Sequence, residues 1–202
     1  KKSLDELVNY LNYERLGKIR TSFNPYSKGL DRYCPPTEAD VNWRQAVIQG
    51  YVHDPNAAIM GGVAGHAGLF SNVYDLTKLL TMLKNGGKYG GQRFLKPSTI
   101  TNFTSQQLSY NRKGLGWDKP ARRGESSSPC SRYASRQTFG HTGFTGTAIW
   151  VDPKYDLVFI FLSNRTYPDQ SNRLLYKENV RVKIHDKVYQ SIFAYKEDGL
   201  NQ

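Results

Sequence analysis

The longest clear apolar run of this 202-residue chain, from Leu157 to Leu162, constrains its fold most. Both alternating faces of the run are apolar, which is typical of a strand that is covered on both sides. Strands are predicted over Thr138 to Val151 and over Tyr155 to Asn164, and their junction at Asp152-Pro153 has the spacing of an antiparallel hairpin. The run is much shorter than the roughly 20 residues of a membrane helix. We therefore expect a sheet protein without a membrane span.

Helices are predicted on both sides of this sheet in the sequence. Ser3 and Glu6 form a capping-box pattern before a helix that Gly17 can end, and Ser71 is the expected N-cap of a second helix. A closing helix is predicted from about Ser171 to Tyr195. Its apolar stripe, which would cover part of the sheet, consists of Leu174, Leu175, Ile184, Val188 and Ile192. The fold class predicted is α/β, an antiparallel sheet flanked by helices.

Three shorter elements complete the expected order. A short helical segment is predicted from Thr37 to Ile48, and a small hairpin is predicted around Gly90-Gly91. Pro97 stands where the first turn of a helix tolerates it, and Gly114 to Trp117 is expected to begin a strand. We find no internal repeat.

The chain is basic, with 28 Lys+Arg against 17 Asp+Glu and a formal charge of +11. Most of the excess lies in residues 51–150, and the densest stretch, Arg112 to Arg136, is rich in Ser, Pro and Gly and is predicted to be a loop. Nucleic-acid binders cluster their basic residues on one face with aromatic residues. A solvated cationic surface is the favoured interpretation, attraction of an anionic small substrate is the alternative, and no nucleic-acid partner is expected.

Cysteine and histidine spacing argues against metal and cofactor sites. Cys34 and Cys130 form no metal-binding pattern, and a disulfide and two free thiols are both compatible with the sequence. No pair among the four histidines has the spacing of metal ligands. Residues 61–68 are glycine-rich but lack the Lys-Ser/Thr of a phosphate-binding loop, so a tight turn is expected there. We expect no metal and no cofactor.

The segment from Phe139 to Thr147 is the strongest candidate for chemistry. It places three glycines and one histidine on a predicted strand, where glycine is unfavourable unless a ligand or another backbone approaches closely. An oxyanion hole needs such an approach, because main-chain N–H groups must point at developing negative charge. A glycine-rich bend with an incidental histidine remains the alternative from these residues alone.

Five motifs occur in a fixed order along nearly the whole chain. They are Val-His-Asp-Pro-Asn-Ala at 52–57, Gly-Gly-Val-Ala-Gly-His-Ala-Gly-Leu-Phe-Ser at 61–71 with Asp-Leu at 75–76, Gly-Leu-Gly-Trp at 114–117, Gly-His-Thr-Gly-Phe-Thr-Gly at 140–146 and Leu-Ser-Asn-Arg at 162–165. This set resembles the serine beta-lactamase-related proteins, that is, penicillin-binding-protein-like, class C-type hydrolases and esterases. It is also similar to the module that follows a family-3 glycoside hydrolase (beta-N-acetylglucosaminidase-like) domain in some bacteria.

The resemblance implies roles for two groups of residues. His141-Thr142-Gly143 stands where the family has its third motif, Lys/His-Thr/Ser-Gly, so His141 and Thr142 would hold a substrate carboxylate or assist proton transfer. The main-chain N–H of Phe144 would be one of two oxyanion donors. The substrate-binding residues implied are His66, Gly65 and Asn56.

The chain departs from the family at the nucleophile. The family motif is Ser-x-x-Lys, in which the lysine takes the serine proton, and none of the fifteen serines here has Lys three residues later. Tyr-x-Asn, the second motif, occurs only at Tyr10, on a helix that follows the true motif in the family. We therefore expect residues 1–202 to be the C-terminal portion of a single hydrolase domain, incomplete at the N-terminus and inactive alone.

The function expected from the resemblance is that of a serine hydrolase resembling beta-lactamases, D-Ala-D-Ala carboxypeptidases or esterases, acting through an acyl-enzyme. Its partners would be a small-molecule or peptidoglycan-derived substrate and the missing N-terminal part, whose strands would cover an otherwise unpaired sheet edge. The resemblance implies the periplasm or cell envelope. The alternative is a non-catalytic module that binds cell-wall fragments, accessory to a glycoside hydrolase.

Overall fold

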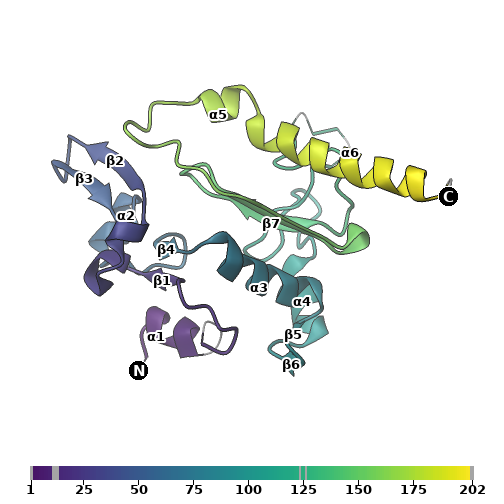
Figure 1. The fold of residues 1–202 in the computed structure, drawn as a ribbon, viewed down its shortest axis with the longest axis horizontal. Helices are drawn as coiled ribbons and strands as arrows, with labels where there is room; N and C mark the ends of the chain where they lie inside the picture. The colour runs from purple at the N-terminus through teal and green to yellow at the C-terminus, as the bar shows by residue number, and fades with distance from the viewer. Residues whose placement is uncertain (1, 11–13, 123, 126, 201–202) are drawn as a thin grey trace. The chain divides into compact units, whose positions relative to one another are not determined.

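The computed structural model describes residues 2–10, 14–122, 124–125 and 127–200 (Figure 1). The chain divides into two compact units. Unit 1 comprises Lys1–Leu79, Phe144–Gly146 and Leu162–Arg173, and unit 2 comprises Leu80–Gly143, Thr147–Phe161 and Leu174–Gln202. We describe each unit by itself.

A three-stranded antiparallel sheet organises unit 2 (Figure 1). Its strands are β7 (Phe139–Thr142), β8 (Ala148–Asp152) and β9 (Leu157–Phe161), in the order β7-β8-β9. A 3₁₀ turn, η4 (Pro153–Tyr155), joins β8 to β9, which confirms the predicted hairpin.

The single strand predicted over 138–151 is wrong, because the chain reverses between β7 and β8. The N–H of Gly143 donates to the carbonyl of Thr147 at 2.8 Å. Gly146 has φ 105°, a conformation that a residue with a Cβ rarely adopts. Gly143 and Gly146, which were predicted to lie within one strand, therefore form a tight reversal between two paired strands.

Trp150 packs across β7 at Gly140 and forms the core of unit 2. The indole is 1% exposed, and a Cβ added at Gly140 would lie 2.5 Å from Trp150 Cε3. Gly140 is therefore needed for packing between strands. The buried cluster around the indole consists of Cys130, Ala148, Trp150 and Phe159.

The predicted closing helix is two helices, α5 (Leu174–Lys177) and α6 (Val180–Leu200). Asn179, with φ 49°, separates them. The predicted apolar stripe is also partly wrong, since Leu174 is 63% exposed and Ile184 is 40% exposed. The residues that α6 buries most deeply are His185 and Tyr189.

His185 and Tyr189 attach α6 to the sheet. The imidazole of His185 stacks on the ring of Phe159, with ring centroids 4.1 Å apart, and its Nδ1 accepts the main-chain N–H of Ser131. Burial lowers the pKa of His185 to about 4, so the ring is neutral at pH 7. A neutral ring suits this site, because a charged imidazolium would lose its hydration there.

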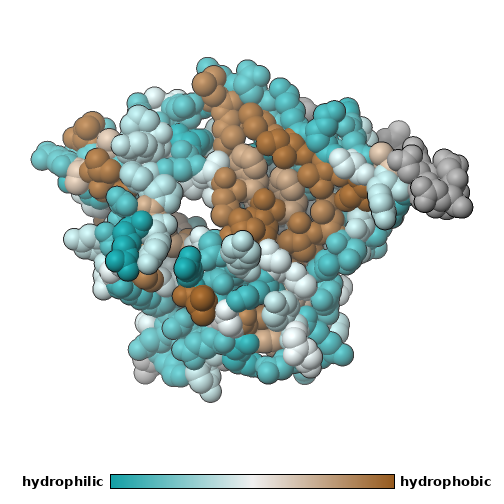
Figure 2. All heavy atoms as spheres, viewed as in Figure 1, coloured by the Kyte–Doolittle hydropathy of each residue, from teal (hydrophilic) through white to brown (hydrophobic). Residues whose placement is uncertain are grey.

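The prediction that the apolar run is covered on both sides is wrong for β9. Four of its five residues are only partly buried, and β9 pairs with β8 alone in the described part of the chain. Figure 2 shows apolar residues gathered over the sheet beside α6. The β7 edge differs, because Asp118 and Gly140 exchange main-chain hydrogen bonds there in an isolated bridge.

The smaller elements of unit 2 follow the local sequence signals. Strands β5 (Lys88–Tyr89) and β6 (Gln92–Arg93) form the predicted hairpin around Gly90-Gly91, and α4 (Pro97–Thr104) begins at the predicted proline. The strand expected to begin at Gly114 is absent among the described residues. That segment contributes only the isolated bridge at Asp118. Helix α3 (Val73–Lys84) runs through the boundary of the two units.

Unit 1 consists of short elements. Helix α1 (Leu4–Val8) has the predicted capping box of Ser3 and Glu6. Strands β1 (Ser22–Phe23) and β4 (Leu69–Phe70) pair antiparallel, the 3₁₀ turns η2 (Pro25–Lys28) and η3 (Asp31–Tyr33) lie between β1 and β2, and α2 (Pro55–Ile59) follows β3.

The helical segment predicted from Thr37 to Ile48 is wrong. These residues form a hairpin of β2 (Pro36–Asp40) and β3 (Ala46–Gln49). The Asp40 carboxylate accepts the N–H groups of Asn42 and Trp43, and Gln45 adopts φ 50°, so the side chain of Asp40 stabilises a turn that competes with helix.

Two further sequence questions are answered for the described residues. No helix among them has the length and apolarity needed to cross a bilayer. Cys34 and Cys130 are free thiols, and burial raises the pKa of Cys130 to about 12. Of the two possibilities left open by the sequence, the structure has two free thiols.

The carboxylate of Asp152, at the end of β8, is the polar centre that joins α6 to the rest of unit 2. It is 1% exposed and accepts the Ser135 N–H at 2.9 Å, the Ser135 hydroxyl at 2.6 Å and the Tyr189 hydroxyl at 2.5 Å. Burial acts to raise the pKa of Asp152, but these hydrogen bonds outweigh it and hold the pKa below its usual value. The carboxylate is therefore ionised at neutral pH.

We expect Tyr189→Phe to lower the free energy of unfolding by about 1.5 kcal/mol at pH 7, because it removes one hydrogen bond to a buried charge. Urea denaturation measures the change. Because the folded pKa of Asp152 is depressed, its stabilisation is present above the unfolded value of about 3.9 and is lost as pH falls through the folded pKa. The effect of the substitution should therefore shrink below about pH 4. An equal loss with the exposed control Tyr195→Phe, or none in either, would contradict the assignment.

Candidate active site

The seven residues predicted for the site fall in two sets. One set, at the end of β7 in unit 2, is His141, Thr142 and Gly143. The other set, in unit 1, is Phe144, Asn56, Gly65 and His66. The catalytic and binding roles of all seven stay predictions.

The end of β7 exposes His141. Its Nδ1 lies 2.8 Å from the carbonyl oxygen of Thr142. A carbonyl can only accept, so Nδ1 donates a proton in this contact. Because side chains alternate along a strand, Thr142 points to the other face of the sheet, where it is partly buried. The imidazole of His141 therefore lies on the exposed side of the strand.

The turn after β7 belongs to unit 1 and contains the predicted oxyanion donor. The Phe144 carbonyl accepts Nε of Arg165 at 2.9 Å, and the Thr145 carbonyl accepts the main-chain N–H of Arg165 at 2.9 Å. The guanidinium of Arg165 also lies over the Phe144 ring, 4.5 Å from its centroid. Arg165 was not predicted to have a role, although it closes the Leu-Ser-Asn-Arg motif.

His53 contacts the same ring from the segment before α2. The imidazole stacks on Phe144, with ring centroids 5.3 Å apart and an interplanar angle of 29°. Its Nε2 lies 2.9 Å from a carboxylate oxygen of Glu38 on β2. Burial lowers the pKa of His53, while the Glu38 carboxylate acts in the opposite direction. His53 belongs to the Val-His-Asp motif but was not predicted to be a site residue.

Arg44 holds the main chain at Val52 and His53 by hydrogen bonds. Its Nε donates to Asp40 at 2.7 Å, and its two terminal nitrogens donate to the carbonyls of Val52 and His53 at 2.8 and 3.0 Å. A hydrogen bond from the Trp43 N–H and the Arg44 side chain lower the pKa of Asp40 to about 2. The β2–β3 hairpin thus holds the segment that leads into α2.

Asp54 connects the predicted substrate-binding residues. Its carboxylate caps α2 by accepting the Ala57 N–H at 2.8 Å, and the same oxygen lies 3.0 Å from Nε2 of His66. These two interactions, the Ala57 N–H first, lower the pKa of Asp54. Asn56 is exposed in the first turn of α2, and Gly65 is exposed beside His66.

The glycine-rich stretch is the tight turn that the sequence predicted. The N–H groups of Gly61 and Gly62 donate to carbonyls of α2 and end that helix. Gly62 has φ 81°, and a Cβ there would lie 2.9 Å from Cγ of Asn24. The turn places His66 where it can reach the cap of α2.

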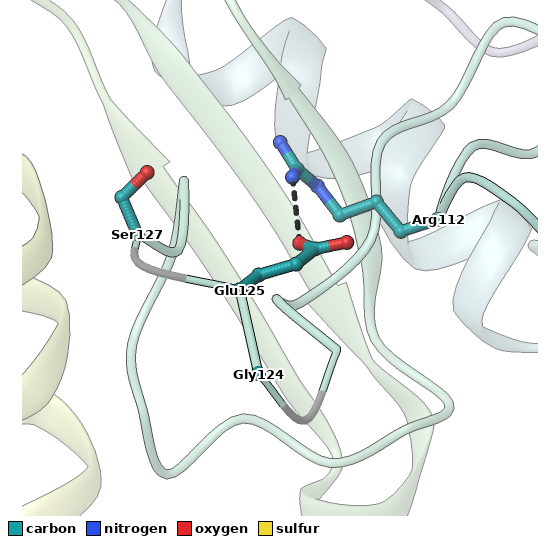
Figure 3. A pocket seen from close by; sticks show the side chains of 4 residues that line it. All are labelled: Arg112, Gly124, Glu125 and Ser127. Atoms are coloured by element: carbon teal, nitrogen blue, oxygen red, sulfur yellow. Dashed lines mark hydrogen bonds and ion pairs between the residues drawn. The ribbon is translucent and has the colours of Figure 1, made fainter.

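The basic stretch from Arg112 contains a shallow pocket in unit 2 (Figure 3). It is lined by Arg112, Gly124, Glu125 and Ser127. Arg112 donates to Asp118 at 2.7 and 3.2 Å and to Glu125 at 2.9 Å. The charge of Arg112 is therefore already compensated by two carboxylates.

Among the described residues, no group of three His, Cys, Asp or Glu side chains is arranged to hold a metal ion. The two exposed histidines of the predicted set are His66, in unit 1, and His141, in unit 2.

Comparison with known proteins shows what the sequence is similar to. The sequence model of the family described as Beta-lactamase matches residues 1–181. A protein of Salmonella gallinarum named "Putative D-alanyl-D-alanine carboxypeptidase" is 37% identical over 187 residues, which cover 84% of this chain and 42% of that protein. A protein of the same name from Salmonella newport is 37% identical over 185 residues. The chain thus spans less than half the length of these relatives.

Solved structures show the same fold. A beta-lactamase from Mycobacterium bovis superposes with a TM-score of 0.57 at 22% identity, covering 93% of this chain and 56% of that chain. A penicillin-binding protein homologue from Caulobacter crescentus gives a TM-score of 0.53 at 16% identity, covering 81% and 47%. The fold is that of beta-lactamases and penicillin-binding proteins, and the predicted fold class is confirmed.

We expect His66→Ala to raise the pKa of Asp54, because the substitution removes one of the two main causes that lower it. The pKa should stay below its usual value, since the Ala57 N–H remains. Carboxyl-carbon NMR titration measures both states. Asp169 is the internal control, because its pKa is lowered by Ser171 without a histidine. An Asp54 pKa that is equal in both proteins would show that the contact is absent in solution.

Proposed function

The chain belongs to the beta-lactamase family, and we propose that it is part of a serine hydrolase that acts through an acyl-enzyme on amide or ester substrates. The observation that carries this proposal is the end of β7, where exposed His141 precedes Thr142, Gly143 and the anchored turn at Phe144. The carboxypeptidase name of the relatives supports peptides derived from peptidoglycan as the substrate class.

The proposed reaction is acyl transfer. A serine oxygen attacks the substrate carbonyl, the leaving amine or alcohol departs with a proton, and water then hydrolyses the acyl-serine to release the acid. The carbonyl oxygen gains negative charge in both steps. The Phe144 N–H stabilises that charge, while His141 and Thr142 hold the substrate carboxylate or assist proton transfer. His66, Gly65 and Asn56 are proposed to bind substrate.

The nucleophile is proposed to come from outside these 202 residues. No serine here has Lys three residues later, and the chain matches 42% of the length of its relative from Salmonella gallinarum. We propose that the chain is one portion of a single hydrolase domain and that another segment supplies Ser-x-x-Lys. The outer edge of β9, which pairs with no strand in the described part of the chain, supports such a partner.

A second candidate function is favoured by the same missing motif. A module that binds cell-wall fragments without catalysis would need the predicted substrate-binding residues but not the nucleophile. This candidate includes an accessory role beside a glycoside hydrolase. For both candidates we propose the periplasm or cell envelope, where peptidoglycan-derived ligands occur.

Intact mass after acylation separates the two candidates. We expect a fluorophosphonate and a penicillin to add one probe mass to a longer gene product that includes a Ser-x-x-Lys, and to add nothing to residues 1–202 alone. The same longer protein with the serine of that motif changed to alanine is the control. If the unmodified longer protein gains no mass with either probe, the hydrolase proposal fails and the binding module is favoured.

The β7 end has its own test in the longer protein. We expect Thr142→Ala to lower the acylation rate about tenfold. This effect is smaller than the roughly 10²–10³-fold fall in rate that follows removal of an oxyanion donor. Thr101→Ala, at an exposed position of α4, is the matched control and should acylate at the unmodified rate. Equal rates for both variants would remove Thr142 from the proposed machinery.

A further inference from the structure

The turn Phe144–Gly146 belongs to unit 1, although the strands before and after it in the sequence belong to unit 2. Its position therefore depends on contacts from segments far away in the sequence. Two side chains provide the main contacts, Arg165 and His53.

Arg165 fixes the main chain of the turn. It is 9% exposed, its Nε donates to the Phe144 carbonyl at 2.9 Å, and its own N–H donates to the Thr145 carbonyl at 2.9 Å. The same guanidinium donates to the carbonyls of Gln170 and Asn172 at 2.8 and 3.0 Å. The planar fork of arginine thus joins two stretches of main chain, which a lysine ammonium cannot do with the same geometry.

His53 fixes the side chain of Phe144. Phe144 is 58% exposed, so solvent alone would leave its ring several rotamers. The ring instead contacts the His53 imidazole at 5.3 Å and the Arg165 guanidinium at 4.5 Å. Glu38 lies 2.9 Å from His53 Nε2, and Arg44 holds the His53 carbonyl.

Together, these contacts restrain the position of one further atom, the Phe144 main-chain nitrogen. Three heavy-atom substituents surround the Cα of Phe144: the carbonyl carbon, the Cβ and the nitrogen. Arg165 fixes the direction of the carbonyl, and the ring contacts fix the direction of the Cβ. Because the bonds of the Cα are tetrahedral, restraining the carbonyl and the Cβ also restrains the position of the nitrogen.

We propose that His53 and Arg165 are positioning residues that hold Phe144 so that its main-chain N–H is set for the substrate oxygen. Glu38 and Arg44 support His53 in this role. The catalytic part of this inference rests on the proposed function, whereas the positioning of the turn does not.

The placement matters because oxyanion stabilisation requires a donor about 2.7–3.1 Å from the developing charge. A misplacement of about 1 Å can cost on the order of 10²-fold in rate. Loss of either positioning residue should therefore slow acylation while substrate binding changes little. A purely structural role would lower the amount of folded protein without this split.

Hydrogen exchange tests the positioning without any need for activity. In the full-length gene product, peptides covering residues 143–147 should exchange at least tenfold faster in His53→Ala and in Arg165→Ala. His53→Phe keeps a ring against Phe144 and should restore most of the protection. Arg32→Ala is the matched control, since Arg32 lies 4.9 Å from the ring centroid of Tyr33 in unit 1 and does not contact the turn. Unchanged exchange in both alanine variants overturns the inference.

Acylation kinetics test the catalytic part in the same proteins. We expect a tenfold to hundredfold lower acylation rate constant for His53→Ala and Arg165→Ala, with a binding constant within about threefold of the unmodified protein. Arg165→Lys, which keeps the charge and loses the fork, should be slowed as well and serves if the alanine variant does not fold.

The outcomes separate this inference from the proposed function. If the unmodified protein is acylated and the variants are acylated equally fast, the inference is wrong and the function stands. If the unmodified protein is not acylated by any probe, the proposed function fails, and the exchange result alone decides whether His53 and Arg165 position the turn.

Discussion

The packing of Trp150 against Gly140 is the contact on which the rest of unit 2 depends. A buried tryptophan of this kind contributes about 3–5 kcal/mol by comparison with truncation to alanine, and here it requires a neighbouring strand residue without a Cβ. The packing sets the register of β7 and β8, with His141 opposite Ile149. Because a slip of one residue would exchange the two faces of a strand, this register decides that His141 is exposed and Thr142 is partly buried.

Charge acts locally in this protein, despite the formal value of +11. Arg112, Arg44 and Arg165 each hold carboxylates or carbonyls within hydrogen-bond distance. Arg44 and Arg165 therefore connect segments of main chain, and Arg112 connects two carboxylate side chains. A net charge computed from the sequence cannot distinguish such connectors from a solvated cationic surface, because the distinction depends on what each side chain contacts.

The residues predicted for the active site include a strand end in unit 2 and a turn in unit 1. The strand end has an exposed imidazole, and the turn contains Phe144, which we propose is positioned by Arg165 and His53. The acyl transfer that we propose requires donors that are already in place when charge develops on the substrate. The two proposed functions differ in one feature: the hydrolase requires a Ser-x-x-Lys supplied by another segment, and the binding module does not.

The sequence by itself determined the features that depend on neighbouring residues. The capping box at Ser3, the turn at Gly90-Gly91, the helix start at Pro97 and the hairpin at Asp152-Pro153 were all predictable. Motif order gave the family and proposed the site residues, whose roles remain predictions. Two local features, the β2–β3 hairpin and the reversal between β7 and β8, were not predicted from the sequence. The burial of His185 and Tyr189 and the contacts that His53 and Arg165 make with Phe144 involve residues far apart in the sequence, and only the tertiary structure decided them. Local patterns fix caps and turns because their partners are a few residues apart, whereas burial and long-range hydrogen bonds depend on where the rest of the chain has folded.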